Sequence, residues 1–194
     1  TAQTKISIVL NPGVNLVSIP GTPVGDGGNI NTLLAALPVT SVATYDRALD
    51  VAGSNPWLTS TKDAETGLFT GDISTIEPGT SYFITATARG TAKVLIETAS
   101  MQLPPSQQFL QGWNAIGYWS ISGATGIDLD SYLSSIKWSV AYTYNPTPGM
   151  GWTVERASQA IYNDAGALVG TADVRAKNGE GWLVFVTEDG TLTP

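Results

Sequence analysis

The sequence contains no cysteine and no histidine. Their absence excludes disulfide scaffolds, thiolate zinc sites, imidazole ligands and any Ser–His catalytic arrangement. With 194 residues the chain is long enough to bury a core without cross-links, so an extracellular setting stays open. We expect no cofactor and no bound metal, and we expect the protein not to be an enzyme.

Charge is scarce as well, and it is mostly negative. Charged residues make up 13% of the chain, and 9 Lys and Arg stand against 16 Asp and Glu for a net charge of −7. Nucleic-acid binding depends on neutralising phosphates, so we expect no nucleic-acid partner. No apolar run reaches the roughly 18 residues of a membrane span, and we expect no membrane insertion. The first residue is threonine and no signal peptide is recognisable, which indicates a mature form or an excised fragment.

Glycine, proline and apolar residues are plentiful. The chain has 21 glycines and 11 prolines, and 42% of it is hydrophobic. This composition favours short elements joined by many turns around a packed core.

The most informative pattern is an internal duplication. Residues 13–18 (GVNLVS) align with residues 112–117 (GWNAIG), and Tyr45-Asp46 aligns with Tyr144-Asn145. Further matches follow in the same order: Trp57 with Trp152, Gly79 with Gly179, Tyr82 with Trp182, and Gly90-Thr91 with Gly190-Thr191. Ordered matches over most of each half predict one structural unit used twice.

We therefore expect two modules, residues 1–97 and residues 109–194, joined by a Pro/Ser/Gln connector over residues 98–108. The predicted fold class is mainly β: two tandem copies of a small antiparallel β module, a sandwich or a half-open barrel, each with one short helix. The helix prediction rests on an apolar stripe of helical spacing in both copies. Its members are Ile30, Leu33, Leu34 and Leu37, with Asn29 as N-cap, and Leu129, Tyr132, Leu133 and Ile136, with Asp128 as N-cap.

Several strands can also be placed. Trp138, Val140, Tyr142 and Tyr144 alternate with small or polar residues, which predicts a strand with one apolar face. Residues 5–10 and residues 91–96 are β-rich and are predicted as terminal strands. If the protein assembles, these two strands are candidates for pairing with a partner strand.

Aromatic residues are the strongest functional signal. Trp57/Trp152 and Tyr82/Trp182 recur in both copies, which predicts that they pack in the core. Trp113, Tyr118, Trp119 and Trp138 occur only in the second copy, so we expect any specific function there. Exposed aromatic faces stack on sugar rings, and the predicted ligand-binding residues are Tyr118, Trp119 and Trp152. The competing interpretation of Tyr118 and Trp119 is an interface between the copies or with a neighbouring subunit.

Other constellations are weaker. The acidic loops around Asp26, Asp63 and Asp128 do not match an EF-hand, and Asp128 is better explained as a helix cap. Five glutamates could in principle supply a glycosidase pair, but no pattern singles out two of them. They are Glu77, Glu97, Glu155, Glu180 and Glu188.

The first copy resembles a repeat of large secreted, surface-layer-type proteins of bacteria and archaea. The resemblance rests on residues 13–20 (GVNLVSIP), Tyr45-Asp46, Trp57 and residues 77–84 (EPGTSYFI). In that family the repeat reads roughly G-W-N-L-[IV]-S-[LI]-P, then Y-D, then W, then P-G-x-G-Y-W. The second copy is similar through residues 112–114, Tyr144-Asn145, Trp152 and residues 179–182. It departs from the pattern at residues 117–119 (GYW), where the family has Ser and an aliphatic residue before Pro.

The family motifs are structural, so the resemblance implies a location and a class of role. We expect a non-catalytic structural or adhesive module of an extracellular, cell-envelope or particle-surface assembly, with virion or filament decoration included. The expected partners are other surface or structural protein subunits. The alternative is a carbohydrate-binding module that uses exposed aromatics of the second copy.

Overall fold

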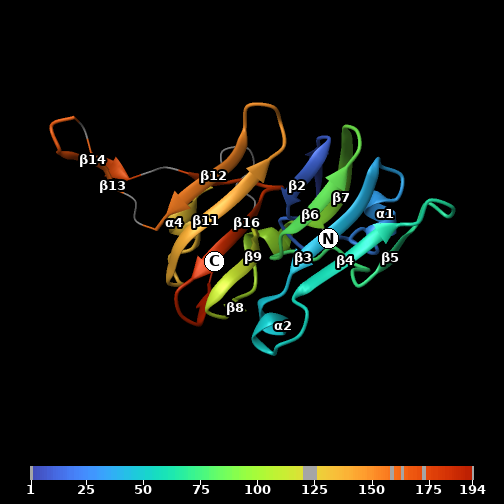
Figure 1. The fold of residues 1–194 in the computed structure, drawn as a ribbon, viewed down its shortest axis with the longest axis horizontal. Helices are drawn as coiled ribbons and strands as arrows, with labels where there is room; N and C mark the ends of the chain where they lie inside the picture. The colour runs from blue at the N-terminus through green and yellow to red at the C-terminus, as the bar shows by residue number, and fades with distance from the viewer. Residues whose placement is uncertain (1, 120–125, 158–159, 163, 172–173, 194) are drawn as a thin grey trace.

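The computed structural model describes residues 2–119, 126–157, 160–162, 164–171 and 174–193. The fold is mainly β with antiparallel sheets, as the sequence predicts. Two larger sheets, one from each module, lie side by side across one broad face of the molecule (Figure 1).

The first module is built on a five-stranded sheet and a separate strand pair. The sheet has the order β2-β6-β3-β4-β5, and β1 pairs with β7. The strands are β1 (Gln3–Leu10), β2 (Gly13–Val17), β3 (Val39–Tyr45), β4 (Trp57–Lys62), β5 (Phe69–Gly71), β6 (Tyr82–Ala86) and β7 (Gly90–Glu97).

The second module repeats this arrangement. Its four-stranded sheet runs β9-β16-β11-β12, and β8 pairs with β17. The strands are β8 (Gln107–Phe109), β9 (Gly112–Gly117), β11 (Trp138–Asn145), β12 (Gly151–Arg156), β16 (Gly181–Val186) and β17 (Gly190–Leu192). Two short pairs complete it: β10 (Ile127–Asp128) with β15 (Arg175–Ala176), and β13 (Ala160–Tyr162) with β14 (Leu168–Thr171).

The two copies share details of register as well as strand order. The pairing of β3 with β6 shifts register between Val39 and Ser41, and the pairing of β11 with β16 shifts between Trp138 and Val140. A bulge at the same place in both sheets shows that the sequence duplication is a duplication of topology.

The capped helices are present in both modules. Helix α1 (Ile30–Leu34) follows Asn29, whose side chain accepts hydrogen bonds from the backbone of Asn31 and Thr32. Helix α4 (Leu129–Tyr132) follows Asp128, whose side chain accepts from Ser131 N. Sequence reasoning missed two further helices. They are α2 (Arg47–Val51), capped by Asp46, and α3 (Thr98–Gln102), which occupies the start of the connector.

Each module has its own hydrophobic core, lying between the larger sheet and the helix with the smaller strand pair. Leu34, Ile84 and Ile96 are buried in the first core, and Leu133 and Val184 in the second. Tyr82 and Trp182 also lie in these cores, at 4% and 1% exposure, as their recurrence predicts.

The predicted terminal strands pair with each other within the chain. β1 and β7 are in register from Gln3 opposite Glu97 to Leu10 opposite Gly90. The backbone groups between these strands are therefore already paired, and this shared edge is not open to a partner strand.

The modules meet through one contact that occurs twice. Ser18 N donates to Gly179 O at 3.1 Å, and Gly117 N donates to Gly79 O at 2.9 Å. Ser18 aligns with Gly117 and Gly79 with Gly179, so each module offers its partner the same two segments. Such reciprocal contacts are the signature of a two-fold interface, here between two halves of one chain.

Equivalent residues face each other at the centre of this junction. A Cβ added to Gly117 would lie 2.9 Å from Ser18 Cβ, and one added to Gly181 would lie 2.6 Å from Ser81 Cβ. Gly117 aligns with Ser18, and Gly181 aligns with Ser81. Only one residue of each pair can carry a side chain, which explains why the second copy has glycine where the first has serine.

Candidate functional site

The outer face of the second module's sheet is aromatic. After the bulge in β11, Ala141 and Thr143 point inward at 0% and 8% exposure, and Tyr142 and Tyr144 alternate with them. The predicted alternation is confirmed, but the expectation of a single apolar face is wrong. Trp138, before the bulge, lies in the core, because the bulge moves the following residues to the opposite face.

These tyrosines belong to a chain of ring contacts that we call the aromatic row: Trp113, Phe185, Tyr142, Trp152 and Tyr144. Ring centroids are 5.3 Å apart for Trp113–Phe185, 5.8 Å for Trp113–Tyr142, 6.2 Å for Tyr142–Trp152 and 4.9 Å for Tyr144–Trp152. Trp113, Tyr142 and Trp152, with Leu183, line a shallow apolar hollow. Trp113 is 38% exposed and Trp152 is 55% exposed.

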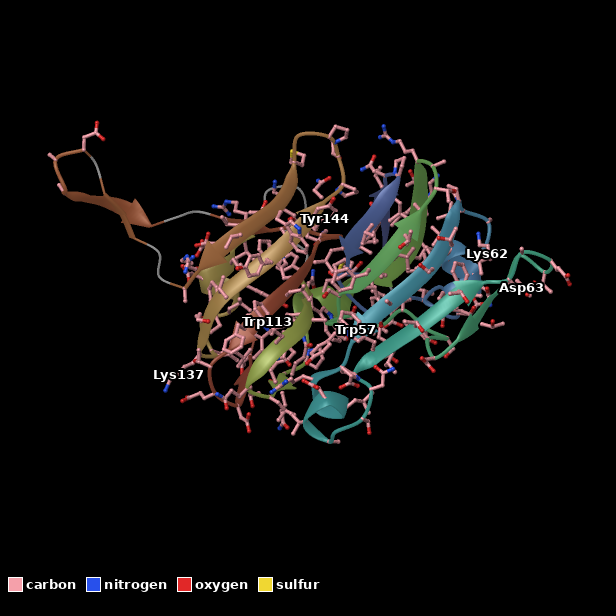
Figure 2. The ribbon with its side chains drawn as sticks, in the orientation of Figure 1. Trp57, Lys62, Asp63, Trp113, Lys137 and Tyr144 are labelled. Atoms are coloured by element: carbon pink, nitrogen blue, oxygen red, sulfur yellow. The ribbon has the colours of Figure 1, made fainter. Side chains whose placement is uncertain are left out.

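The first module carries a shorter version of the row. Trp57 contacts Tyr45 at 5.4 Å and Phe83 at 6.0 Å between ring centroids. Val14 and Ala43 stand where the second module has Trp113 and Tyr142. In Figure 2, Trp113 lies over the second module's sheet, and Trp57 lies near the middle of the molecule, where the modules meet.

The predicted core position of the recurring tryptophans is wrong. Trp57 and Trp152 are 45% and 55% exposed, on the outer faces of β4 and β12. They recur because the repeat preserves an outward ring at this place in the sheet, and sequence recurrence alone does not distinguish that from a core position.

Of the three predicted binding residues, only Trp152 is open to solvent. Tyr118 is 0% exposed and packs edge-on against Tyr132, and its backbone N donates to Ser18 Oγ. Trp119 is 9% exposed, and its Nε1 donates to Ser100 O in the connector helix. The Tyr118 side chain lies in the second module's core and the Trp119 side chain contacts the connector, so neither belongs to the exposed aromatic site.

A cleft at the module junction adjoins the aromatic row. It is lined by Asn11 and Val17 of the first module and by Tyr144, Thr153, Asn178 and Glu180 of the second. We call it the Glu180 cleft. Tyr144 belongs to both features, because it lines the cleft and its ring contacts Trp152.

The junction's two-fold relationship creates a second, equivalent cleft. It is lined by Tyr45, Arg47, Glu77, Thr80 and Asn114, and we call it the Arg47 cleft. The arginine of this cleft is paired within the chain. Arg47 Nη1 lies 2.5 Å from Asp50 Oδ2, and Arg47 Nε donates to Gln111 O at 2.7 Å. Tyr45 OH also bonds Asp50, and burial together with this bond raises the pKa of Tyr45.

The Glu180 cleft is different, because two buried acceptor atoms in it have no donor. Among the described residues, Glu180 Oε1 and Asn178 Oδ1 are buried and have no hydrogen-bond partner. The Glu180 peptide is nevertheless fixed, since its carbonyl accepts a hydrogen bond from Ser18 Oγ. Burial raises the pKa of the Glu180 carboxyl, because desolvation disfavours the charged form and outweighs the backbone hydrogen bond and the charge of Lys177, which lower the pKa.

Within the described ranges no three acidic side chains lie close enough together to hold a metal ion. Asp63 accepts from the backbone of Glu65 and Thr66, and these bonds lower its pKa. Glu77 and Glu180 line different clefts. No helix in the described part of the chain is both long and apolar enough to cross a bilayer.

No family model, no curated protein and no solved structure matches this chain.

Proposed function

We propose that this protein is a non-catalytic structural or adhesive module of an extracellular, cell-envelope or particle-surface assembly. The observation that carries the proposal is the aromatic row on the outer face of the second module. Large exposed apolar side chains that cluster on one face mark interaction surfaces in soluble proteins. The expected partners are other structural subunits of the same surface, which would cover this face.

The low charge of the chain supports a surface of this kind. Of 194 residues only 25 are charged, as 9 basic and 16 acidic side chains. An aromatic sheet face with few charges buries apolar area at little desolvation cost, and aromatic anchors dominate the energy of many interfaces. The row is complete in the second module and shortened in the first, so we expect the second module to make the principal contact.

A substitution pair tests this role. Trp152→Ser removes the most exposed indole of the row, and Trp57→Ser removes its equivalent in the first module. We expect Trp152→Ser to weaken self-association or binding to purified surface subunits by at least about tenfold, and Trp57→Ser to have a smaller effect. Light scattering coupled to size exclusion and sedimentation velocity provide the measurement. A strict monomer that binds no surface subunit would contradict the proposal.

The second candidate function is carbohydrate binding. It is favoured by the exposed indole of Trp152, whose neighbour Tyr144 opens onto a polar cleft. Sugar rings stack on aromatic faces, while a few convergent polar groups fix their orientation. A glycan array followed by titration of tryptophan fluorescence with each hit tests this function, and Trp152→Ala should abolish the signal. An empty array would reject the function.

A further inference from the structure

We infer that the Glu180 cleft binds the hydroxyl groups of an oligosaccharide whose neighbouring sugar rings stack on the aromatic row. This inference rests on the carbohydrate-binding function and adds to it a polar subsite made jointly by both modules. Three features of the cleft support it in turn.

The first feature is a pair of acceptors that lack donors. Glu180 Oε1 and Asn178 Oδ1 are buried without a hydrogen-bond partner in the described part of the chain. Buried polar atoms are nearly always paired, so such a pair calls for donors from outside the protein. Sugar hydroxyls supply them, and a carboxylate is the stronger acceptor of the two.

The second feature is continuity between the polar and aromatic surfaces. Tyr144 lines the cleft, and its ring centroid lies 4.9 Å from that of Trp152. A chain of sugar rings stacked on Trp152 can therefore continue past Tyr144 and present its next hydroxyls to the cleft. The cleft also offers the side chains of Asn11 and Thr153, which can both donate and accept.

The third feature is the contrast with the Arg47 cleft. The same fold elements build both clefts, with Tyr45 matching Tyr144 and Asn114 matching Asn15. In the Arg47 cleft, Thr80 stands at the position of Glu180, and Arg47 is paired with Asp50. The Arg47 cleft thus supplies an internal control that is built from equivalent elements but has Thr80 in place of the Glu180 carboxyl group.

The subsite depends on the docked modules. Val17 forms an isolated bridge with Glu180, and Ser18 Oγ donates to the Glu180 carbonyl. The first module therefore fixes the backbone that carries the carboxyl group. Neither module alone contains the complete cleft.

The experiment is isothermal titration calorimetry of the full chain with maltopentaose, cellopentaose, mannopentaose and chitopentaose. The variants are Glu180→Gln, Trp152→Ala and the matched control Glu77→Gln, which changes the equivalent cleft. We expect one oligosaccharide to bind, Trp152→Ala to abolish binding, and Glu180→Gln to weaken it by about tenfold or more. Glu77→Gln should change the affinity by less than about twofold.

Thermal unfolding separates this effect from misfolding. Burial penalises the Glu180 charge, so Glu180→Gln should unfold at the same temperature as the wild type or above it at neutral pH. A variant that is stable but binds weakly supports the inference.

The experiment distinguishes failure of the cleft subsite from failure of the carbohydrate-binding function. If Trp152→Ala abolishes binding while Glu180→Gln and Glu77→Gln leave it unchanged, the carbohydrate function stands and the cleft is overturned. If no oligosaccharide binds, the subsite and the carbohydrate function are both rejected, and the adhesive role is judged by its own assay.

Discussion

At the scale of single residues, buried tyrosines tie stability to alkaline pH. Tyr82 and Tyr132 are 4% and 6% exposed, and burial raises the pKa of each to about 12. Tyr82 OH accepts from Glu77 N, and Tyr132 OH accepts from Trp119 N and donates to Gly117 O. Burial keeps both hydroxyls neutral, while the backbone hydrogen bonds that they accept act in the opposite direction and lower the pKa.

The sign of the pH dependence follows from these values. An unfolded tyrosine ionises near pH 10, whereas the folded residues resist ionisation until about pH 12. Stability is therefore fully present below pH 10 and falls as the pH rises from about 10 to about 12. Denaturant unfolding followed across this range should show the loss, and the Tyr82→Phe variant should show a shallower one. A profile that stays flat up to pH 12 would contradict the burial of these hydroxyls.

At the scale of secondary-structure elements, the caps of α1 and α4 are readable from the sequence. Asn29 and Asp128 cap α1 and α4 because their side chains satisfy backbone N–H groups that a helix leaves unpaired. Asp46 is a third cap of the same kind, before α2. The sequence carried this signal, but the segment after it lacks an apolar stripe, and no residue of α2 is buried.

Removing the caps of α1 and α2 should lower the free energy of unfolding by different amounts. Asn29→Ala removes bonds to the backbone of Asn31 and Thr32 and should lower the free energy of unfolding by about 1 kcal/mol. Asp46→Ala acts on a helix that packs no buried residue, so we expect it to cost less in global unfolding. Chemical denaturation measures both. Equal effects of the two substitutions would argue against a core role for α1.

The element scale also shows where pattern reading fails. The period of β11 is readable from its alternation, but the face that it buries is not. One bulge between Trp138 and Val140 puts Trp138 in the core and sends Tyr142 and Tyr144 to the outer face. A shift of one residue exchanges the two faces of a strand, so the bulge decides the composition of the site.

At the scale of the whole molecule, the junction between the modules is the feature with the largest consequence. Residues of both modules line each cleft, and Ser18 of the first module bonds the backbone of Tyr118 in the second. Its centre tolerates one side chain in each facing pair, as Ser81 against Gly181 shows. The divergence of the copies at these positions is a packing requirement of the two-fold arrangement.

This requirement yields a reciprocal prediction. Gly181→Ser places a Cβ 2.6 Å from Ser81 Cβ and 3.0 Å from Val17 O, and should destabilise the protein by about 1–3 kcal/mol through overpacking. Exchanging the pair, with Ser81→Gly added to Gly181→Ser, should recover most of that loss because the side chain moves across the axis. Denaturant titrations of the single and double variants provide the measurement. A double variant no better than Gly181→Ser would refute the two-fold explanation.

Sequence by itself determined the duplication, the mainly β class and the capped helices. These features follow from composition, from periods of two and 3.6 residues, and from capping chemistry, all of which act within a few neighbouring residues. Only the tertiary structure decided that Trp57 and Trp152 point outward, that Tyr118 and Trp119 are buried, and that Glu180 faces a cleft. Those outcomes depend on the bulge in β11 and on tertiary packing within and between the modules. The residues that make these contacts lie far apart along the chain, so no local sequence pattern predicts them.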